Sequence, residues 1–181
     1  MFIIKDNFYN NPEEVRNYAL SLDFDVAGNY PGLRTRSCVE PFLTNMKLEL
    51  ENILGRKITY WPTGYNSAFQ YTTKDSKTWV HHDDTQWAAV VYLTPDAQIE
   101  AGTGIYRHKE TQIYKHTEES LDLNTIETKE EEWELLDSCA NLYNRIVVYE
   151  GMLYHRSILP GFGNTKYDGR LFQTFFFNTE Y

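Results

Sequence analysis

Residues 79–95 read WVHHDDTQWAAVVYLTP, a polar turn followed by a continuous apolar run. The run from Trp87 to Leu93 is rich in aliphatic and aromatic residues, which favours a strand buried on both faces. Four ligand-type side chains, His81 to Asp84, stand just before this run. In an extended segment residues i and i+2 point to the same side. The stretch therefore predicts a buried strand with an imidazole and a carboxylate side by side at its entrance.

Other parts of the chain show the same strand texture. Residues 143–149 (YNRIVVY) and 171–178 (LFQTFFFN) predict two more buried strands, and the aromatic stretch from Lys57 onward predicts several short ones. Glycines such as Gly151 and Gly169 indicate turns between them.

Helices are expected mainly near the N-terminus. Asn10 to Glu14 has an Asn cap, a proline in the first turn and acids near the positive end of the helix dipole. Apolar residues at helical spacing predict a second helix over about 40–54, and a short third helix is expected over about 130–138. Two helices followed by many strands predict an α+β chain whose β part is a sandwich or jelly roll, with the helices packed outside.

Length and charge narrow the class of protein. The 181 residues fit a single domain, 1–181, and the start of the chain lacks the features of a signal peptide. Two cysteines form no disulfide framework, so a reducing, cytoplasmic location is expected. The net charge of −9 argues against a general nucleic-acid binder. Residues 109–142 hold ten acids and three bases, a net of −7, and interrupt the strand pattern.

A third ligand-type residue completes a metal-binding pattern. His155 follows the predicted strand 143–149 and a turn at Gly151. Two histidines and one carboxylate on a facial triad leave three coordination positions open, as in non-haem Fe(II) sites. Two frames fit the first pair, His81 with Asp83 or His82 with Asp84, and alternation alone does not choose between them.

At this point the chain resembles the 2-oxoglutarate/Fe(II)-dependent dioxygenase superfamily, in its small prolyl-hydroxylase-like or uncharacterised branch. The matching pieces cover most of the chain: DNFYNNPEEVRNYALSLDF (6–24), WVHHDD (79–84), VVYLTP (90–95), AGTGIYRH (101–108), YNRIVVYEGMLYHRS (143–157) and GRLFQTFFF (169–177). The acidic segment 109–142 departs from the pattern and looks like an insertion. The resemblance implies a double-stranded β-helix, the jelly roll of this superfamily, with the N-terminal helices outside the major sheet.

The resemblance also implies ligands and roles. The superfamily places an apolar residue before the first ligand, so Val80 favours His81, Asp83 and His155 as iron ligands. Arg170 would pair with the distal carboxylate of 2-oxoglutarate, since its planar fork suits a carboxylate; Arg156 and Arg145 are rivals. Tyr71, Tyr92 and Thr174 would complete that site. Residues that would support the ligands or face the substrate are His82, Asp84, Thr103, Tyr106, His108 and Arg34.

The implied function is hydroxylation of a small molecule or a protein side chain, with Fe(II) as cofactor and 2-oxoglutarate as co-substrate. Two alternatives remain open. A cupin-like metal enzyme would use a similar triad without 2-oxoglutarate, and a β-sandwich binding module would carry no stoichiometric iron. The acidic segment could cover the site, with Trp133, Leu135 and Leu136 as its apolar underside. The residues leave substrate identity and oligomeric state open.

Overall fold

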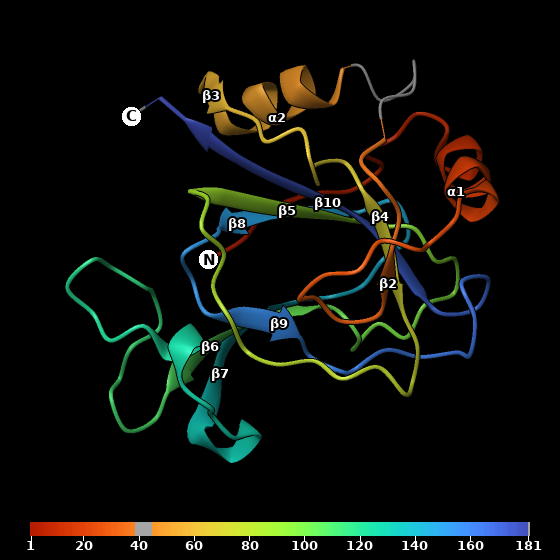
Figure 1. Cartoon of the computed structure of the whole chain (residues 1–181). Helices are drawn as coiled ribbons and strands as arrows, with labels where there is room; N and C mark the ends of the chain where they lie inside the picture. The colour runs from red at the N-terminus through yellow and green to blue at the C-terminus, as the bar shows by residue number, and fades with distance from the viewer. Residues whose placement is uncertain (39–44, 181) are drawn as a thin grey trace.

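The computed structural model describes residues 1–38 and 45–180, in which two antiparallel sheets dominate (Figure 1). The larger, seven-stranded sheet has the order β1-β8-β5-β10-β4-β2, and β3 pairs with the far end of β10. Its strands are β1 (Ile3–Lys5), β8 (Ile146–Glu150), β5 (Trp87–Tyr92), β10 (Arg170–Thr179), β4 (Phe69–Thr72), β2 (Leu33–Arg34) and β3 (Ile58–Tyr60). The apolar runs that predict buried strands thus form the centre of this sheet.

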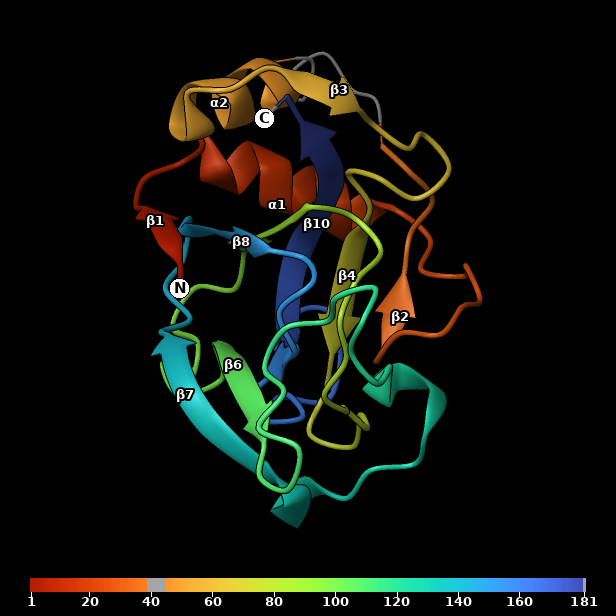
Figure 2. The same cartoon turned by 90° about the vertical axis from the view of Figure 1, so that its left-hand side faces the viewer.

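The smaller sheet has three strands in the order β7-β6-β9. These are β7 (Trp133–Cys139), β6 (Thr103–His108) and β9 (His155–Ser157). In both views it lies on the side of the large sheet away from the helices (Figures 1 and 2). The expectation of an α+β chain is confirmed, and both of its sheets are antiparallel.

Two helices cover the opposite face of the large sheet. Helix α1 (Pro12–Ser21) and helix α2 (Met46–Leu54) contribute buried residues such as Val15 and Leu50 to the main core. Helix α1 begins with the predicted proline, and α2 ends at Gly55, which has the left-handed conformation that favours glycine. The first part of the predicted second helix, residues 40–44, lies outside the described residues. No helix in the described ranges is long and apolar enough to cross a membrane.

Alternation along β5 separates two cores. Ala89 and Val91 join the helix-side cluster, whereas Val90 and Tyr92 join a second cluster with Ile105 of the small sheet. The period of two in a strand produces this division. The interior between the two sheets is therefore reached only by every second residue of each strand.

The prediction of a helix over 130–138 is wrong. Only Glu130–Glu132 forms a short 3₁₀ helix, and Trp133–Cys139 is strand β7, paired with β6 along its whole length. Glu and Leu are good helix formers, but their intrinsic preference is small compared with the backbone hydrogen bonds that the edge of β6 offers. The acidic segment 109–142 therefore contains one strand of the small sheet.

Hydrogen bonds to Asp168 hold the end of the loop between β9 and β10 in place. Its carboxylate accepts hydrogen bonds from the backbone N–H groups of Asn164 and Thr165, at 3.2 and 2.8 Å, and from the Thr165 hydroxyl. Beyond it, Thr94 at the end of β5 donates to the Gly169 carbonyl and accepts from Leu171 N–H. These bonds fix the point where β10 begins.

We expect Asp168→Asn to lower stability in a pH-dependent way. The hydrogen bonds to Thr165 lower the pKa of the Asp168 carboxyl to about 2 from its ordinary 3.8. A lowered pKa stabilises the fold above the unfolded-state value, and the contribution disappears as the pH falls through the folded-state value. The difference in unfolding free energy between the wild type and the variant should be constant above about pH 5 and shrink between about pH 4 and 2. Urea unfolding across this range measures it. A pH-independent difference, or an equal effect of Asp75→Asn at an exposed turn, would contradict this account.

Candidate metal site

The site is built on a backbone bridge between His81 and His155. Each residue donates its N–H to the other's carbonyl, at 3.0 Å from His81 and 2.7 Å from His155. Residues directly opposite each other in an antiparallel pair send their side chains to the same face. The two imidazole rings accordingly lie 4.6 Å apart between centroids.

Asp83 reaches the same face because it lies two residues beyond His81 in extended chain. Its N–H donates to the carbonyl of Gly151, at 2.8 Å. A side chain at Gly151 would not fit, since an added Cβ would stand 2.3 Å from the Thr85 carbonyl oxygen and 3.3 Å from the Asp83 Cβ. Glycine at 151 therefore lets the segment 81–85 approach the turn that precedes β9.

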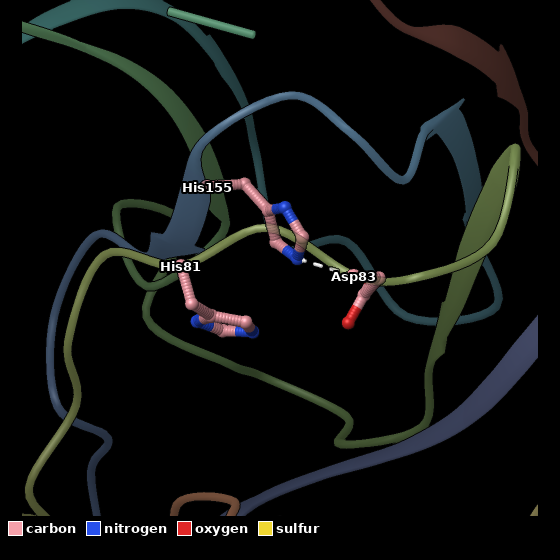
Figure 3. A group of neighbouring side chains, drawn as sticks. All are labelled: His81, Asp83 and His155. Carbon is pink, nitrogen blue, oxygen red and sulfur yellow. Dashed lines mark ion pairs between the residues drawn. The ribbon is translucent and has the colours of Figure 1, made fainter. Parts of the chain in front are cut away.

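Figure 3 shows the three side chains converging on one point. The Nε2 atom of His155 lies 3.4 Å from Oδ2 of Asp83, and one ligand atom from each of the three residues lies within 4.8 Å of the others. Two ligand atoms about 2.1 Å from one metal ion and about 90° apart are about 3.0 Å from each other. The spacing is thus close to that of a metal ligand set.

Hydrogen bonds orient both imidazoles for coordination. Nδ1 of His81 is 3.0 Å from the Trp79 carbonyl oxygen, and Nδ1 of His155 is 2.7 Å from that of Leu153. A carbonyl only accepts, so each Nδ1 carries a proton, and in the neutral imidazole Nε2 then has the lone pair that could bind a metal ion. Metal-bound histidines commonly donate their other ring N–H in this way.

The electrostatics of the trio also fit a cation. Burial raises the pKa of Asp83 and lowers that of His155, because both charged forms lose hydration. Within the described residues, Oδ2 of Asp83 is buried and accepts no hydrogen bond. A buried carboxylate oxygen without a donor is costly, and a bound divalent ion would relieve that cost.

The alternative pair, His82 with Asp84, does not converge with His155. His82 is buried on the far side of the segment, with its Nε2 3.0 Å from Oδ1 of Asp122 and its ring stacked on His116 at 4.2 Å and 3°. His82, His116 and Asp122 also form a compact group, but the two stacked rings keep their lone pairs in parallel planes, so the lone pairs do not meet at one point. Asp84 is exposed at the rim of the neighbouring cavity.

A cavity of about 650 Å³ adjoins the trio. Arg170, Thr174 and Thr103 line it together with His81, Asp83 and His155, and the Tyr92 hydroxyl lies 2.7 Å from the Thr103 hydroxyl. Arg170 is 2% exposed and donates from Nε to the Ala101 carbonyl. No ion pair of Arg170 occurs within the part of the chain that the structure describes.

The rival arginines have partners elsewhere. Arg156 lines the cavity but is paired with Glu130, and Arg145 is paired with Asp6 at 2.6 Å. Arg170 thus differs from both in offering a guanidinium without a carboxylate of the described chain beside it.

Three residues expected at the site lie elsewhere. Tyr71 packs against Phe24 on the helix side of the sheet, because neighbouring residues of β4 alternate between faces. Tyr106 joins an outer cluster with Trp133, following an irregularity of register after Ile105. The His108 ring also stacks edge-on against Trp133. None of these three side chains lines the cavity.

The acidic segment covers the cavity with other residues than expected. Leu123, Ile126 and Thr128 line it, whereas Trp133 faces an outer cluster and Leu135 is exposed. Asn124 fastens this cover, because its amide accepts from His82 N–H at 3.1 Å and donates to the His82 carbonyl at 2.9 Å. Sequence reasoning missed Asn124 and the cavity residue Gln70, since neither stands in a motif.

Comparison with solved structures identifies the class of fold. HygX from Streptomyces hygroscopicus, solved with nickel, 2-oxoglutarate and hygromycin B, is 14% identical over 96% of this chain and 81% of its own, with a TM-score of 0.59. A prolyl-4-hydroxylase from Pseudomonas putida is 14% identical over 99% and 93%, with a TM-score of 0.55. A prolyl hydroxylase from Trichoplax adhaerens, in complex with a hypoxia inducible factor peptide, is 12% identical over 97% of this chain and 82% of its own, with a TM-score of 0.58. The chain shares the fold of these 2-oxoglutarate/Fe(II)-dependent oxygenases.

The chain belongs to the family described as "Family of unknown function (DUF6445)", which matches residues 1–177. No curated protein matches its sequence.

We expect His155→Ala to abolish stoichiometric binding of a divalent metal ion. Removing this imidazole leaves two ligands, which hold Mn²⁺, Fe²⁺ or Zn²⁺ far more weakly than three. Anaerobic titration with Fe²⁺, followed by metal analysis after gel filtration, measures the stoichiometry. His108→Ala is the control, because that side chain packs on Trp133 away from the cavity. Equal metal content in both variants would refute the assignment of His155.

A second prediction concerns Gly151. Gly151→Ala should force the segment at Asp83 and Thr85 away from the turn, with a loss of stability of about 1–3 kcal/mol and weaker metal binding. Gly64→Ala is the matched control, because nothing lies within 4 Å of an added Cβ there. Thermal unfolding with and without metal separates the two effects. If both alanine variants behave alike, close packing at Gly151 does not shape the site.

Proposed function

We propose that this protein is a non-haem Fe(II) and 2-oxoglutarate-dependent oxygenase that hydroxylates a small molecule or a protein side chain. One observation carries the proposal: His81, Asp83 and His155 converge beside a cavity that also contains a buried arginine without a carboxylate partner among the described residues. The structural neighbours support it, since HygX was solved with iron bound and with nickel and 2-oxoglutarate bound.

The fold assignment can be made finer within this proposal. The large sheet and the small sheet would be the two halves of a double-stranded β-helix, with α1 and α2 outside the major one. The ligands would then stand where both halves approach each other, since His155 belongs to the small sheet and Asp83 leads into β5. Residues 1–181 would form one domain.

The geometry supports the proposed ligand roles. The two Nε2 atoms and the Asp83 carboxylate would hold Fe(II) on one face and leave the other face to the cavity. Iron and 2-oxoglutarate together would supply the activation of dioxygen for oxidation of a C–H bond. The chain's own task is to hold these groups, exclude water and position the substrate.

Arg170 would bind the distal carboxylate of 2-oxoglutarate. Burial lowers the pKa of this guanidinium, yet its ordinary value lies so high that the charge is kept. The rings of Phe172 and Tyr92 lie beside it, at 4.4 and 5.3 Å from the guanidinium carbon. These rings and the Ala101 carbonyl hold the fork in place, and low local polarity strengthens its attraction for an anion. Thr174 and the Tyr92–Thr103 hydroxyl pair would supply neutral hydrogen bonds nearby.

The test separates this enzyme from a cupin-like metal enzyme that does without 2-oxoglutarate. Anaerobic addition of Fe(II) and then 2-oxoglutarate to the wild type should give the weak visible charge-transfer band of a chelated 2-oxo acid. In Arg170→Gln the 2-oxoglutarate concentration needed for half of the band should rise about 10- to 100-fold, as expected for one charged hydrogen-bonded pair. Arg170→Lys should recover part of the loss, because it keeps the charge and loses the fork.

Arg156→Gln is the matched control at the same cavity, since Arg156 already pairs with Glu130. It should leave the half-saturation concentration of 2-oxoglutarate unchanged. Circular dichroism establishes that each variant is folded. A wild type that shows no band, or an Arg170→Gln variant that binds 2-oxoglutarate normally, would rule out the assignment.

A further inference from the structure

A further arginine, Arg34, faces the same cavity from β2, the edge strand of the large sheet. Arg34 on β2 stands opposite Gln70 on β4, and Gln70 stands opposite Phe172 on β10. Directly opposed residues share a face, so all three side chains point inward with Arg170, two residues before Phe172. Neighbouring strands are about 4.8 Å apart, which puts the backbones of Arg34 and Phe172 about 10 Å apart. Arg34 is therefore separate from the Arg170 position.

The Arg34 side chain is held in one orientation. Its Nε and Nη2 both donate to the Oε1 of Gln70, at 2.9 and 2.6 Å. Gln70 is itself buried and donates to the Pro31 carbonyl. The guanidinium carbon lies 3.9 Å from the centre of the Tyr30 ring, which supports the planar group by a cation–π contact. The Nη1 edge is not used in these contacts.

This guanidinium has no carboxylate partner in residues 1–38 and 45–180. A charge that has lost part of its hydration is unfavourable without an opposite charge, and Arg145 and Arg156 of the same chain each have one. Asp83 acts on Arg34 electrostatically from a distance, but a bound metal ion would neutralise that carboxylate. Arg34 thus remains oriented, partly desolvated and open to an anion.

We propose that Arg34 binds an anionic group, a carboxylate or a phosphate, on a small-molecule substrate. The proposal rests on the proposed function, because it takes the metal ion and 2-oxoglutarate to occupy the deeper part of the cavity. A planar guanidinium pairs with either anion through parallel hydrogen bonds.

The surroundings of Arg34 indicate the size and nature of the substrate. A cavity of about 650 Å³ lies within the range of small-molecule sites, roughly 300–1,000 Å³. Tyr30, Tyr65 and Trp79 line it, which suits an apolar body between the anion and the metal. Asp84 and Glu127 at its border, and the acidic segment behind Glu127, would repel an extended polyanion such as nucleic acid.

The experiment uses three probes that share an aromatic body: 3-phenylpropionate, phenyl phosphate and the neutral 3-phenylpropionamide. Each is titrated calorimetrically, without oxygen, into the protein loaded with Fe(II) and saturating 2-oxoglutarate, so that Arg170 is already occupied. We expect one of the two anions to bind at least about tenfold more tightly than the amide, which corresponds to one charge-assisted pair. The preferred anion distinguishes a carboxylate substrate from a phosphate substrate.

Arg34→Gln should abolish the preference for the anion and leave the 2-oxoglutarate charge-transfer band unchanged. Arg36→Gln, two residues away and exposed, should keep the preference. Arg34→Lys should recover part of it, because the charge remains.

Other results would overturn the proposal. These are equal binding of all three probes or of none, a preference that survives in Arg34→Gln, and a weaker affinity of Arg34→Gln for 2-oxoglutarate, which would assign Arg34 to the co-substrate. Loss of the charge-transfer band in the wild type would instead count against the proposed function, and the same samples report it.

Discussion

The pair of backbone hydrogen bonds between His81 and His155 is the constraint on which the site depends. It joins residues 74 positions apart and sets their side chains on one face. Asp83 follows from it through strand alternation and its own bond to Gly151. The backbone register places all three side chains on one face, where they can meet. The geometry of the trio is thus a property of the sheet pairing before it is one of the side chains.

Groups of opposite charge lie at separate places in the cavity. Within the described chain, one oxygen of the Asp83 carboxylate accepts no hydrogen bond, and two guanidinium groups, Arg170 on β10 and Arg34 on β2, have no carboxylate partner. Isolated buried charges are expensive, and a fold that needed only stability would do better with apolar residues there. The unsatisfied groups have opposite signs at separate places, which matches a cation and two anions brought in from solution.

The sequence allowed a good prediction of the elements with uninterrupted apolar texture. The runs at β5, β8 and β10 and the proline at the start of α1 were enough to place them, because burial on both faces leaves a local signature. Strand β7 was not predictable in this way, since EEEWELLDS has helical propensity and its state is decided by the distant edge of β6. Tyr71 and Tyr106 were misplaced for a related reason: a shift of one residue in phase turns a strand side chain to the other face.

The candidate ligands illustrate the same limit. The i, i+2 spacing indicated that an imidazole and a carboxylate belong together, but it left two frames, and only cross-strand pairing shows which frame faces His155. Arg170 could be suggested only by resemblance. Its distinguishing property, the lack of a partner that Arg145 and Arg156 have, is a fact of three-dimensional packing.

The residues of the acidic segment that line the cavity fall into two groups, which differ in their hydrogen bonds to the candidate ligand segments. Asn124 holds the backbone of His82, between the candidate ligands His81 and Asp83, and Leu123 N–H donates to the Tyr154 hydroxyl, next to His155. Ile126 and Thr128, a few residues further on, line the cavity, and in the described part of the chain they make no such bonds to residues 81–83 or 153–155. Substitutions at Ile126 and Thr128 would change the shape of the cavity, while the bonds of Asn124 keep the backbone of the candidate ligands in place. Within one short segment, the chain thus joins a hydrogen-bonded anchor at Asn124 to a stretch whose side chains can vary in evolution without loss of those bonds.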